Sequence, residues 1–549
     1  MEFRPRLLFF SHIGSPEAIT GAEKLLLSTI VELSAVADCT LAVPEEGILS
    51  GRAAAAGIPV RVTGHVPIYY SMYLGLPSVP EEVEEGTGSE AMERLYRLLL
   101  EIRPHAAWVN TCVQPLPAIA AKRLGIPVIW CLTETMRPAA GVGPTMKLIE
   151  QHADRVVGIS ASTLKPLASP LALSRSEVLL PGVDTAAFKP WTWASSRAVR
   201  RAELGLQEKQ VLVGFIASHL YENKGLEHFL AAAGMAAASR PDLRFVVIGN
   251  PVDAEYAARC ARIADAAGLS ARLSWLPFEP DVSRAYPAMD VLVVPSIVEE
   301  GFGMTALEGL LFGKPVVAYA SGGLAEILHA TGNADWLAPM GDYAGLAERI
   351  GRLADNAPLR LATGTRSGAA ALAVFGMPAF RGRLLASLER LRLPREPESR
   401  IAHGSGPERG LLAGWTLRPI ASPEAEASAG LGGVPRVQLP DGVLALLTRG
   451  EPIGSPPAEP AAAAEPPAPA SPSLAGGRRE RLRRKGRLRR GKAGARGEPG
   501  AASAAARPGA GVPAAPRAAA RSALPAAEPA GRSARASIFN PKGGMDECE

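Results

Sequence analysis

Cysteine is scarce in this chain of 549 residues, and long apolar runs are missing. Its five cysteines lie far apart, at Cys39, Cys112, Cys131, Cys260 and Cys548, and no CxxC pair or Cys/His cluster occurs. The sequence therefore indicates neither a disulfide framework nor a zinc site, which fits a reducing cytosol. No apolar run approaches the ~18 to 20 residues that cross a bilayer, and the first residues lack the features of a signal peptide. We expect a cytoplasmic protein, at most peripheral at the inner face of the membrane.

Several common functional motifs are also absent. No HExxH occurs, and GLLFGKP (309–315) has neither the spacing nor the Ser/Thr of a Walker A loop. The stretch GFGMTA (301–306) lacks the third glycine of a dinucleotide fingerprint. The net charge of +5 is small for this length and unevenly spread, so no specific nucleic-acid partner is expected.

Aromatic residues almost vanish after residue 400, where Ala, Pro, Gly, Arg and Glu dominate. Only Trp415 and Phe539 remain. Such a composition buries too little apolar surface to offset the entropy lost on ordering. We predict a disordered low-complexity tail over 397–549, in which a weak apolar patch, VPRVQLPDGVLALLTRG (434–450), could form a local element.

The same tail contains a strongly basic run, RRERLRRKGRLRRGK (478–492). The plainest interpretation is a solvated charged segment. Contact with anionic lipid headgroups or with nucleic acid is the sharper alternative. A third is an out-of-frame extension without a selected role.

Before residue 400, short β-branched runs alternate with Ala/Leu-rich amphipathic stretches. RLLFF, CTLAV, AAWVN, PVIWCL and RVVGIS form one set, and VLVGFIAS, RFVVIGN, RLSWLP, VLVVPS and PVVAYA form a second. This alternation predicts βαβ units and parallel sheets. We predict an α/β protein with two doubly wound, Rossmann-like domains, 1–182 and 194–396, joined by a linker at 183–193. The carboxyl ends of both sets of strands would face a cleft, where ligands bind in such folds.

Two carboxylates flank a glycine loop in EEGFGMTALEGLLFG (299–313), directly after the run VLVVPS. A glycine loop that leads into a helix N-terminus presents free N–H groups to a phosphate. The turn at 321–323 repeats this arrangement, so two helix N-termini could hold a diphosphate. Glu308 would then reach ribose hydroxyls and Glu300 an attached sugar. The alternatives are a capping box, in which Thr305 pairs with Glu308, and an exposed loop carboxylate at Glu300.

These residues resemble a known family. EEGFGMTALEGLLFGKPVVAYASGGLAEIL (299–328) is similar to the E-x7-E signature of the retaining glycosyltransferases of family 4, which have the GT-B fold. TGAEKLLLSTI (20–30), HADRVVGISASTLKPL (152–167), LLPGVDTAAFKP (179–190) and ENKGLEHFLAAA (222–233) resemble further family segments in the same order. The resemblance covers about residues 5–395. It implies that the first domain binds an acceptor and the second a nucleotide sugar.

The resemblance also implies roles for individual residues. Lys224 would contact the donor diphosphate, Glu300 the donor sugar and Glu308 the ribose, with Lys224 and Glu300 counted as catalytic. The backbone of Phe302, Gly303, Met304 and Thr305 would bind phosphate, and Gly21 or Gly14 would approach the diphosphate from the first domain. Since no D-x-D pair occurs, we expect no metal and no cofactor. In this family the departing phosphate is thought to take the acceptor proton, so no nucleophile is assigned.

This chain departs from the family pattern at a few positions. His219, which we count among the donor-binding residues, stands where the family often has the arginine that partners the lysine. Thr133 and Glu134 stand where a histidine often follows the strand. These two and His12 are candidates for the acceptor side. The alternative for each is an ordinary loop residue, and His12 could also contact the donor sugar.

The resemblance implies transfer of a sugar, with retention, from a UDP- or GDP-linked donor to a hydroxyl of a glycan or lipid-linked acceptor. A role in polysaccharide or glycoconjugate biosynthesis and a peripheral contact with the membrane would follow. Two alternatives stay open. One is different nucleotide-sugar chemistry, such as an epimerase or a phosphorylase. The other is a degenerate, non-catalytic module docked through its basic tail, which the substitution at His219 keeps open.

Overall fold

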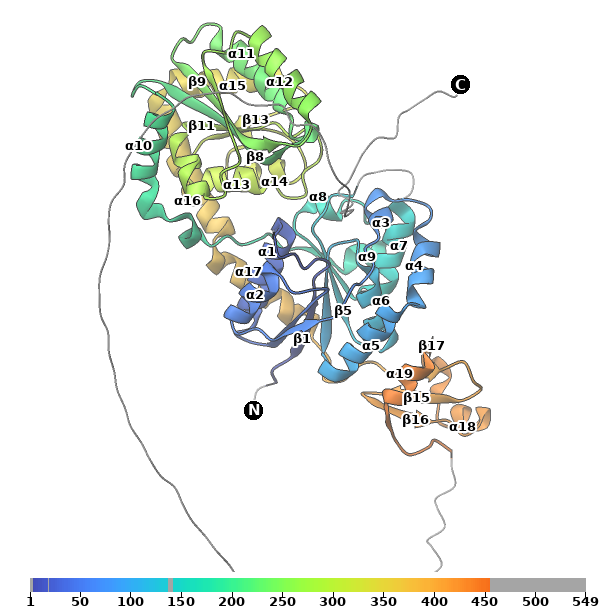
Figure 1. Ribbon diagram of the computed structural model, residues 1–549. Coiled ribbons are helices and arrows are strands. Elements are labelled where there is room, and N and C mark those ends of the chain that lie inside the picture. Colours follow the sequence, from blue (N-terminus) through green and yellow to red (C-terminus); the bar gives the residue numbers. More distant parts are fainter. Residues whose placement is uncertain (1–2, 18, 137–141, 455–549) are drawn as a thin grey trace, which may run out of the picture. The chain divides into compact units, whose positions relative to one another are not determined.

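The first sheet is parallel, and its strands follow the spatial order β3-β2-β1-β4-β5-β6-β7. Figure 1 labels β1 and β5 of this sheet. The computed structural model describes residues 3–17, 19–136 and 142–454, and the basic run at 478–492 lies outside them. The strands are β1 (Arg6–Phe10), β2 (Asp38–Val43), β3 (Val60–Val62), β4 (Ala106–Asn110), β5 (Val128–Leu132), β6 (Arg155–Gly158) and β7 (Ser176–Val178). Strand order reverses between β1 and β4, which places a crevice at their carboxyl ends.

Helices cover both faces of this sheet. Along β1, Leu7 and Phe9 belong to one buried cluster, whereas Leu8 and Phe10 belong to another. Successive side chains of a strand point to opposite faces, so both faces of β1 are buried. The helices are α1 (Gly21–Leu33), α2 (Ile48–Ala55), α3 (Tyr70–Leu74), α4 (Val79–Thr87), α5 (Glu90–Ile102), α6 (Pro115–Arg123), α7 (Val142–His152), α8 (Ala161–Leu164) and α9 (Pro170–Ser174).

The second sheet repeats the design with the order β10-β9-β8-β11-β12-β13. Its strands are β8 (Val211–Leu220), β9 (Leu243–Pro251), β10 (Leu273–Leu276), β11 (Val291–Val294), β12 (Val316–Tyr319) and β13 (Leu337–Ala338). Its helices are α10 (Trp193–Glu203), α11 (Leu226–Ala237), α12 (Ala254–Ala266), α13 (Met304–Leu311), α14 (Gly323–Ala330), α15 (Tyr343–Asp355) and α16 (Ala357–Phe375). The predicted pair of doubly wound, Rossmann-like domains is confirmed.

A last long helix, α17 (Met377–Leu391), returns to the first domain. The Ser387 hydroxyl donates to Glu177 at 2.5 Å, and Arg381 pairs with Glu32 of α1. Two chain segments therefore cross between the domains, and Val183 forms a bridge with Gly376 where they meet. The predicted second domain, 194–396, therefore includes a helix, α17, that contacts the first domain. An amphipathic pattern predicts such a helix, but it does not predict on which domain the helix packs.

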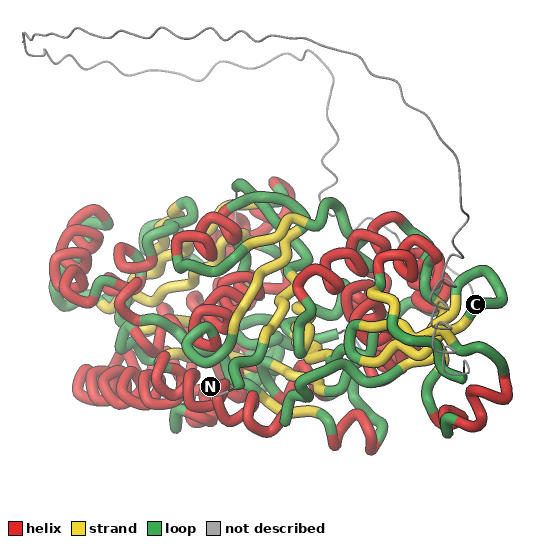
Figure 2. The backbone as a smooth tube through the Cα atoms, turned by 90° about the horizontal axis from the view of Figure 1, so that it is seen from below, coloured by secondary structure: helices red, strands yellow, loops and turns green. Residues whose placement is uncertain are grey.

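A third, mixed sheet follows, in the order β17-β14-β15-β16-β18. Figure 2 draws the strands of the described residues in yellow and the helices in red. It is built from β14 (Arg400–His403), β15 (Arg409–Ala413), β16 (Thr416–Pro419), β17 (Arg436–Gln438) and β18 (Thr448–Arg449), with α18 (Pro423–Ser428) and α19 (Asp441–Leu446). The prediction of disorder from residue 397 is therefore wrong for 397–454. The patch at 434–450 does form local elements.

The reason for this miss lies in the packing. Leu412, Leu417 and Val443 belong to the same buried cluster as Leu95 and Leu99 of α5. The segment therefore completes a core with the first domain, and it needs fewer apolar residues than a separate domain would.

In the described part of the chain, no helix combines the length and apolar character needed to cross a bilayer.

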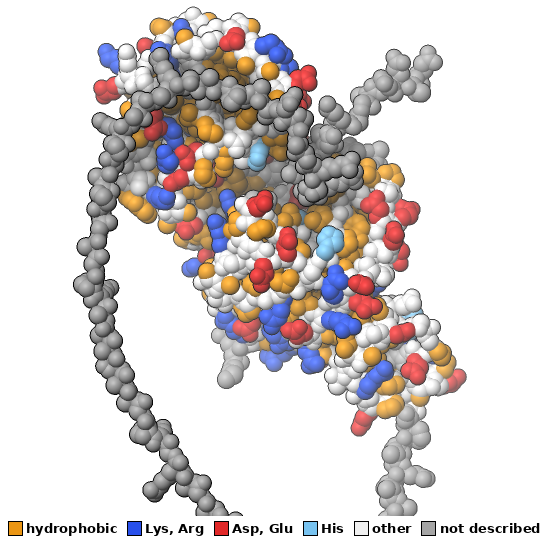
Figure 3. All heavy atoms as spheres, in the orientation of Figure 1, with side chains coloured by type: hydrophobic (Ala, Val, Ile, Leu, Met, Phe, Trp, Pro, Cys, Tyr) orange, Lys and Arg blue, Asp and Glu red, His pale blue; other side chains and the backbone are white. Residues whose placement is uncertain are grey.

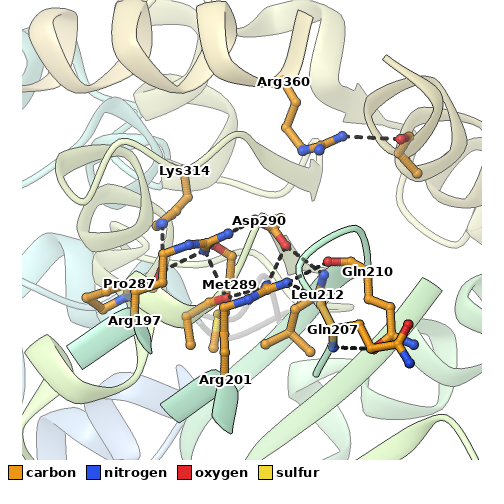
Figure 4. A network of polar contacts seen from close by, with 12 residues as sticks. Arg197, Arg201, Gln207, Gln210, Leu212, Pro287, Met289, Asp290, Lys314 and Arg360 are labelled. Atoms are coloured by element: carbon orange, nitrogen blue, oxygen red, sulfur yellow. Dashed lines mark hydrogen bonds and ion pairs between the residues drawn. The ribbon is translucent and has the colours of Figure 1, made fainter. Parts of the chain in front are cut away.

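One polar network secures β11 inside the second domain (Figure 4). Asp290, directly before β11, accepts from Arg197 at 2.6 Å and from Arg201 at 2.9 Å, both on α10. It also accepts the Leu212 backbone N–H at 2.8 Å. Burial acts to raise the pKa of Asp290, but Arg197, this N–H group and Arg201 hold it below its usual range. The network fixes the strand that leads into the glycine loop.

Candidate functional site

A cleft of about 460 Å³ lies at the carboxyl ends of β8 and β11. The first domain lines it with Gly21, Ala22, Leu25, Thr133, Ile159 and Pro181. The second domain contributes 215–218, Lys224, 293–296 and 300–305. Of the predicted site residues, the structure thus brings together Gly21, Thr133, Lys224, Glu300, Phe302, Gly303, Met304 and Thr305.

Two glycine turns place the N-termini of α13 and α14 against each other. Gly303 has φ +104° and precedes α13, and a Cβ there would lie 2.4 Å from a Leu324 methyl group. Gly322 precedes α14, and a Cβ there would lie 2.4 Å from the Glu300 carbonyl oxygen. The Gly323 N–H donates to that same oxygen at 2.8 Å. Only glycine allows this close approach of two helix starts. The first N–H groups of α13 have no partner within their own helix, whereas the Leu324 N–H of α14 donates to the Ser321 carbonyl oxygen at 3.0 Å.

Lys224 and Glu300 form an ion pair in this cleft. The ammonium lies 2.7 Å from Glu300 Oε1, and the hydroxyl of Ser296 donates to the same oxygen at 2.7 Å. Gly225 brings the Lys224 turn to the end of β11, since a Cβ on it would lie 1.9 Å from the Pro295 carbonyl oxygen. The pair offers one cation that suits a phosphate and one carboxylate that suits sugar hydroxyls.

Glu308 lies one turn into α13 and outside the residues that line the cleft. Its Oε2 accepts from the Tyr286 hydroxyl at 2.8 Å. Burial raises the pKa of Glu308, while this hydrogen bond lowers it. The alternative capping box with Thr305 is wrong, because the helix is capped by Gly303. The ribose role of Glu308 stays a prediction.

Two further predicted residues, His219 and Glu134, lie away from the cleft lining. His219 is exposed, and its Nδ1 lies 3.3 Å from the Ser218 hydroxyl, where the pairing of β8 with β9 resumes after a register shift between Ile216 and His219. Glu134 accepts the Cys112 N–H at 3.2 Å and the Thr133 hydroxyl at 2.8 Å, so its carboxylate is used within its own loop. Burial raises the pKa of Glu134.

Gly14 and His12 border a separate cavity of about 340 Å³ in the first domain. A Cβ on Gly14 would lie 2.2 Å from the Glu45 carbonyl oxygen, so this glycine packs against the loop after β2. The structure therefore favours Gly21 over Gly14 as the glycine that faces the donor cleft.

A clasp between the two domains, made by Ser160, Gly301 and Glu326, was not predicted. The Ser160 hydroxyl donates to the Gly301 carbonyl oxygen at 2.6 Å. Glu326 of α14 accepts the N–H groups of Ala161 and Ser162, at 2.7 and 2.8 Å, at the start of α8. The motif SGGLAEIL contained Glu326, but nothing in it indicates the partner. The clasp fixes the glycine loop relative to the first domain.

We expect Glu326→Gln to weaken this clasp. Charge-assisted hydrogen bonds contribute more than neutral ones, so the variant should lose about 1–2 kcal/mol of unfolding free energy. It should also bind UDP a few-fold more weakly, because the loop at Gly301 would be less fixed. Calorimetric titration and urea unfolding measure both quantities. The control is Glu348→Gln, the same change at an exposed glutamate of α15. Equal losses of stability and UDP affinity in the two variants would contradict the clasp.

Among the described residues, no group of three or more His, Cys, Asp or Glu side chains could hold a metal ion. The four described cysteines are buried and free. Acidic and basic side chains both occur on the face shown in Figure 3.

The second domain contains the region that matches a known protein family. Residues 196–367 match the family model described as glycosyl transferases group 1. This range includes both glycine turns and the Lys224–Glu300 pair. The D-inositol 3-phosphate glycosyltransferase of Mycobacterium sp. (strain KMS) is 39% identical over 155 residues, which are 28% of this chain and 33% of that protein. The one from Nocardia farcinica is 31% identical over 224 residues, which are 38% and 48% of the two chains.

Over these alignments the chain thus spans a third to about half of the relatives' length. The solved structure of Anabaena Alr3699/HepE in complex with UDP and glucose has a TM-score of 0.57 and 20% identity. The match covers 70% of this chain and 100% of the Anabaena chain. Together with the two facing Rossmann-like domains, this likeness confirms the predicted GT-B fold.

Proposed function

We propose that this chain is a retaining, metal-independent glycosyltransferase that moves a sugar from a UDP- or GDP-linked donor to an acceptor hydroxyl. The observation that carries the proposal is the Lys224–Glu300 pair beside the adjoining N-termini of α13 and α14, within the range that matches group 1 glycosyl transferases. The Anabaena neighbour was solved with UDP and glucose, which favours uracil as the base.

The geometry suggests how the residues would divide the work. The donor diphosphate would lie against the N–H groups of Met304 and Thr305 at the start of α13, which line the cleft and where the helix dipole favours negative charge. The Lys224 ammonium would leave Glu300 and offset the charge that develops on the leaving diphosphate. Glu300, still held by Ser296, would then accept hydrogen bonds from the donor sugar. Gly21, on the first domain, would approach the diphosphate from the other side of the cleft.

The transfer step is balanced without a protein nucleophile. The bond between the anomeric carbon and the diphosphate oxygen breaks, and a bond from that carbon to the acceptor oxygen forms on the same face. The acceptor proton passes to the departing diphosphate. Glu308, bonded to Tyr286, would accept from the ribose with its second oxygen. We place the reaction in the assembly of polysaccharides or glycoconjugates.

The test is a thermal-shift series on the full chain with UDP, GDP and ADP and their glucose conjugates, followed by a turnover assay. We expect one nucleotide class to raise Tm by several degrees, as binding to the native state alone requires. Lys224→Ala should abolish that shift, whereas Lys209→Ala, the same charge change at an exposed residue, should keep it. Binding without turnover of any nucleotide sugar would support the non-catalytic alternative. Absence of any shift would overturn the donor site.

A further inference from the structure

The cavity beside His12 is separate from the donor cleft and has its own chemistry. Its polar side chains are His12, Glu45 and His65, and Ile13, Val66 and Ile68 supply apolar surface. It lies at the carboxyl edge of the first sheet, among the loops that follow β1, β2 and β3. The segment after β1 borders both cavities, since His12 lines this one and Gly21, at the start of α1, lines the cleft.

Close backbone contacts hold these loops in place. A Cβ on Gly14 would meet the Glu45 carbonyl oxygen, and a Cβ on Gly47 would lie 2.3 Å from the Ser15 carbonyl oxygen. The Ile48 N–H donates to that Ser15 oxygen at 2.9 Å. The cavity is therefore formed in advance by backbone packing, which is a property of small-molecule sites.

One ring nitrogen at this cavity has no partner. His12 Nδ1 is buried and makes no hydrogen bond within the described residues. Burial lowers the pKa of His12 to about 4, so the ring is neutral at pH 7. Buried polar atoms are almost always hydrogen-bonded, and an unpaired one next to a cavity indicates a ligand or water partner. A neutral imidazole can exchange a hydrogen bond with a hydroxyl group.

The charge of the cavity argues against a phosphorylated ligand. Glu45 provides a carboxylate, and none of the described residues that line the cavity is Lys or Arg. The start of α2 offers little compensation, because the Gly47 N–H donates to Ser50 at 2.8 Å and the Ile48 N–H to Ser15. A phosphate there would face the Glu45 carboxylate with no lysine or arginine among the described lining residues to balance it, which is unfavourable.

We propose that this cavity receives the acceptor, and that the acceptor is an uncharged sugar or polyol rather than a phosphorylated one. The proposal rests on the proposed function. Acceptor hydroxyls donate to Glu45 and bond with His12, and the apolar face of the ring packs on Ile13, Val66 and Ile68. The relatives reported above are named for a phosphorylated acceptor, and the range that matches the family model, 196–367, does not include these loops. The acceptor class would then differ from theirs.

The test uses matched acceptor pairs with the full chain and a saturating donor: glucose and glucose 6-phosphate, and inositol and inositol 3-phosphate. We expect kcat/KM for the uncharged member of a pair to exceed that of its phosphate ester at least about 10-fold. Glu45→Gln should raise the acceptor KM about 10-fold without changing the UDP-induced thermal shift. Glu45→Lys should shift the preference toward the phosphate ester. Preference of the wild-type chain for a phosphate ester would overturn the proposal.

A binding measurement separates this proposal from the proposed function. Saturation-transfer NMR of the same pairs reads the cavity even where no donor is turned over. If no nucleotide sugar is consumed but the uncharged ligand binds and Glu45→Gln weakens it, the cavity assignment stands and the transferase assignment fails. If neither member binds, or if Glu45→Gln leaves both binding and KM unchanged, the cavity assignment is overturned. Glu46→Gln, an exposed neighbour outside the lining residues, is the matched control.

Discussion

Glu300→Gln is expected to lower kcat by about 10²- to 10³-fold, while UDP affinity changes by less than about threefold. The carboxylate lies in the cleft, where Lys224 and Ser296 both bond to its Oε1. In the proposed reaction it holds the donor sugar and offsets the charge that grows at the anomeric centre. An amide preserves the shape but removes this charge, so the loss should fall on the transition state rather than on nucleotide binding. Initial rates of UDP release over a range of donor concentrations measure it.

The neighbouring residue Glu299 provides a matched control. Glu299 pairs with the exposed Lys165 at 2.8 Å and does not line the cleft. Glu299→Gln should therefore change kcat by less than about threefold, since exposed ion pairs contribute little. Similar losses in both variants would mean that loop charge in general, and not the Glu300 carboxylate, supports activity. A Glu300→Gln variant with wild-type kcat would remove Glu300 from the catalytic site.

The main architecture was predictable because buried parallel strands need continuous apolar runs. VLVVPS gave β11, and the glycines after it gave the loop that leads into α13. A strand covered by helices on both faces leaves no polar alternation, so its signal is strong even in one sequence. The motif around Glu300 then placed the cleft at the correct strand ends.

Side-chain direction was not predictable at the same level. His219 is exposed and follows a shift in strand register, which no local pattern in VLVGFIASHL reveals. Glu134 is held within its own loop by the Cys112 N–H and Thr133, and these bonds depend on how two strand ends meet. The Glu326 clasp joins residues 165 positions apart. Such contacts follow from tertiary packing, which hydrophobic periodicity does not encode.

The third sheet illustrates a different limit. A prediction of disorder from composition assumes that a segment must build a hydrophobic core by itself. Residues 397–454 contain too few large apolar residues to do so. Their apolar side chains instead enlarge an existing core around α5. A segment that docks on a finished domain needs to bury only one face, so composition underestimates its order.

Asp290→Asn is expected to lower the free energy of unfolding of the second domain by about 3–5 kcal/mol. Arg201 is 10% exposed in its side chain and Asp290 12%. The substitution would leave Arg201 largely buried with no carboxylate to balance its charge. It would also weaken the acceptor for the Leu212 N–H. Urea unfolding monitored by circular dichroism measures the loss, and Asp242→Asn, an exposed change in the same domain, should cost less than about 0.5 kcal/mol.

The pH dependence gives an independent check on the same network. The pKa of Asp290 is lower in the folded chain than its usual 3.8, so the folded state binds the proton less readily than the unfolded state. Its contribution to stability is therefore fully present above the unfolded pKa and is lost as the pH falls through the folded pKa. Between about pH 5 and pH 2.5, wild-type stability should decline more steeply than that of Asp290→Asn. Parallel declines would show that the pairing with Arg197 and Arg201 contributes nothing to folding. Since β11 leads directly into the loop at Glu300, a loss of this network should also weaken UDP binding at neutral pH.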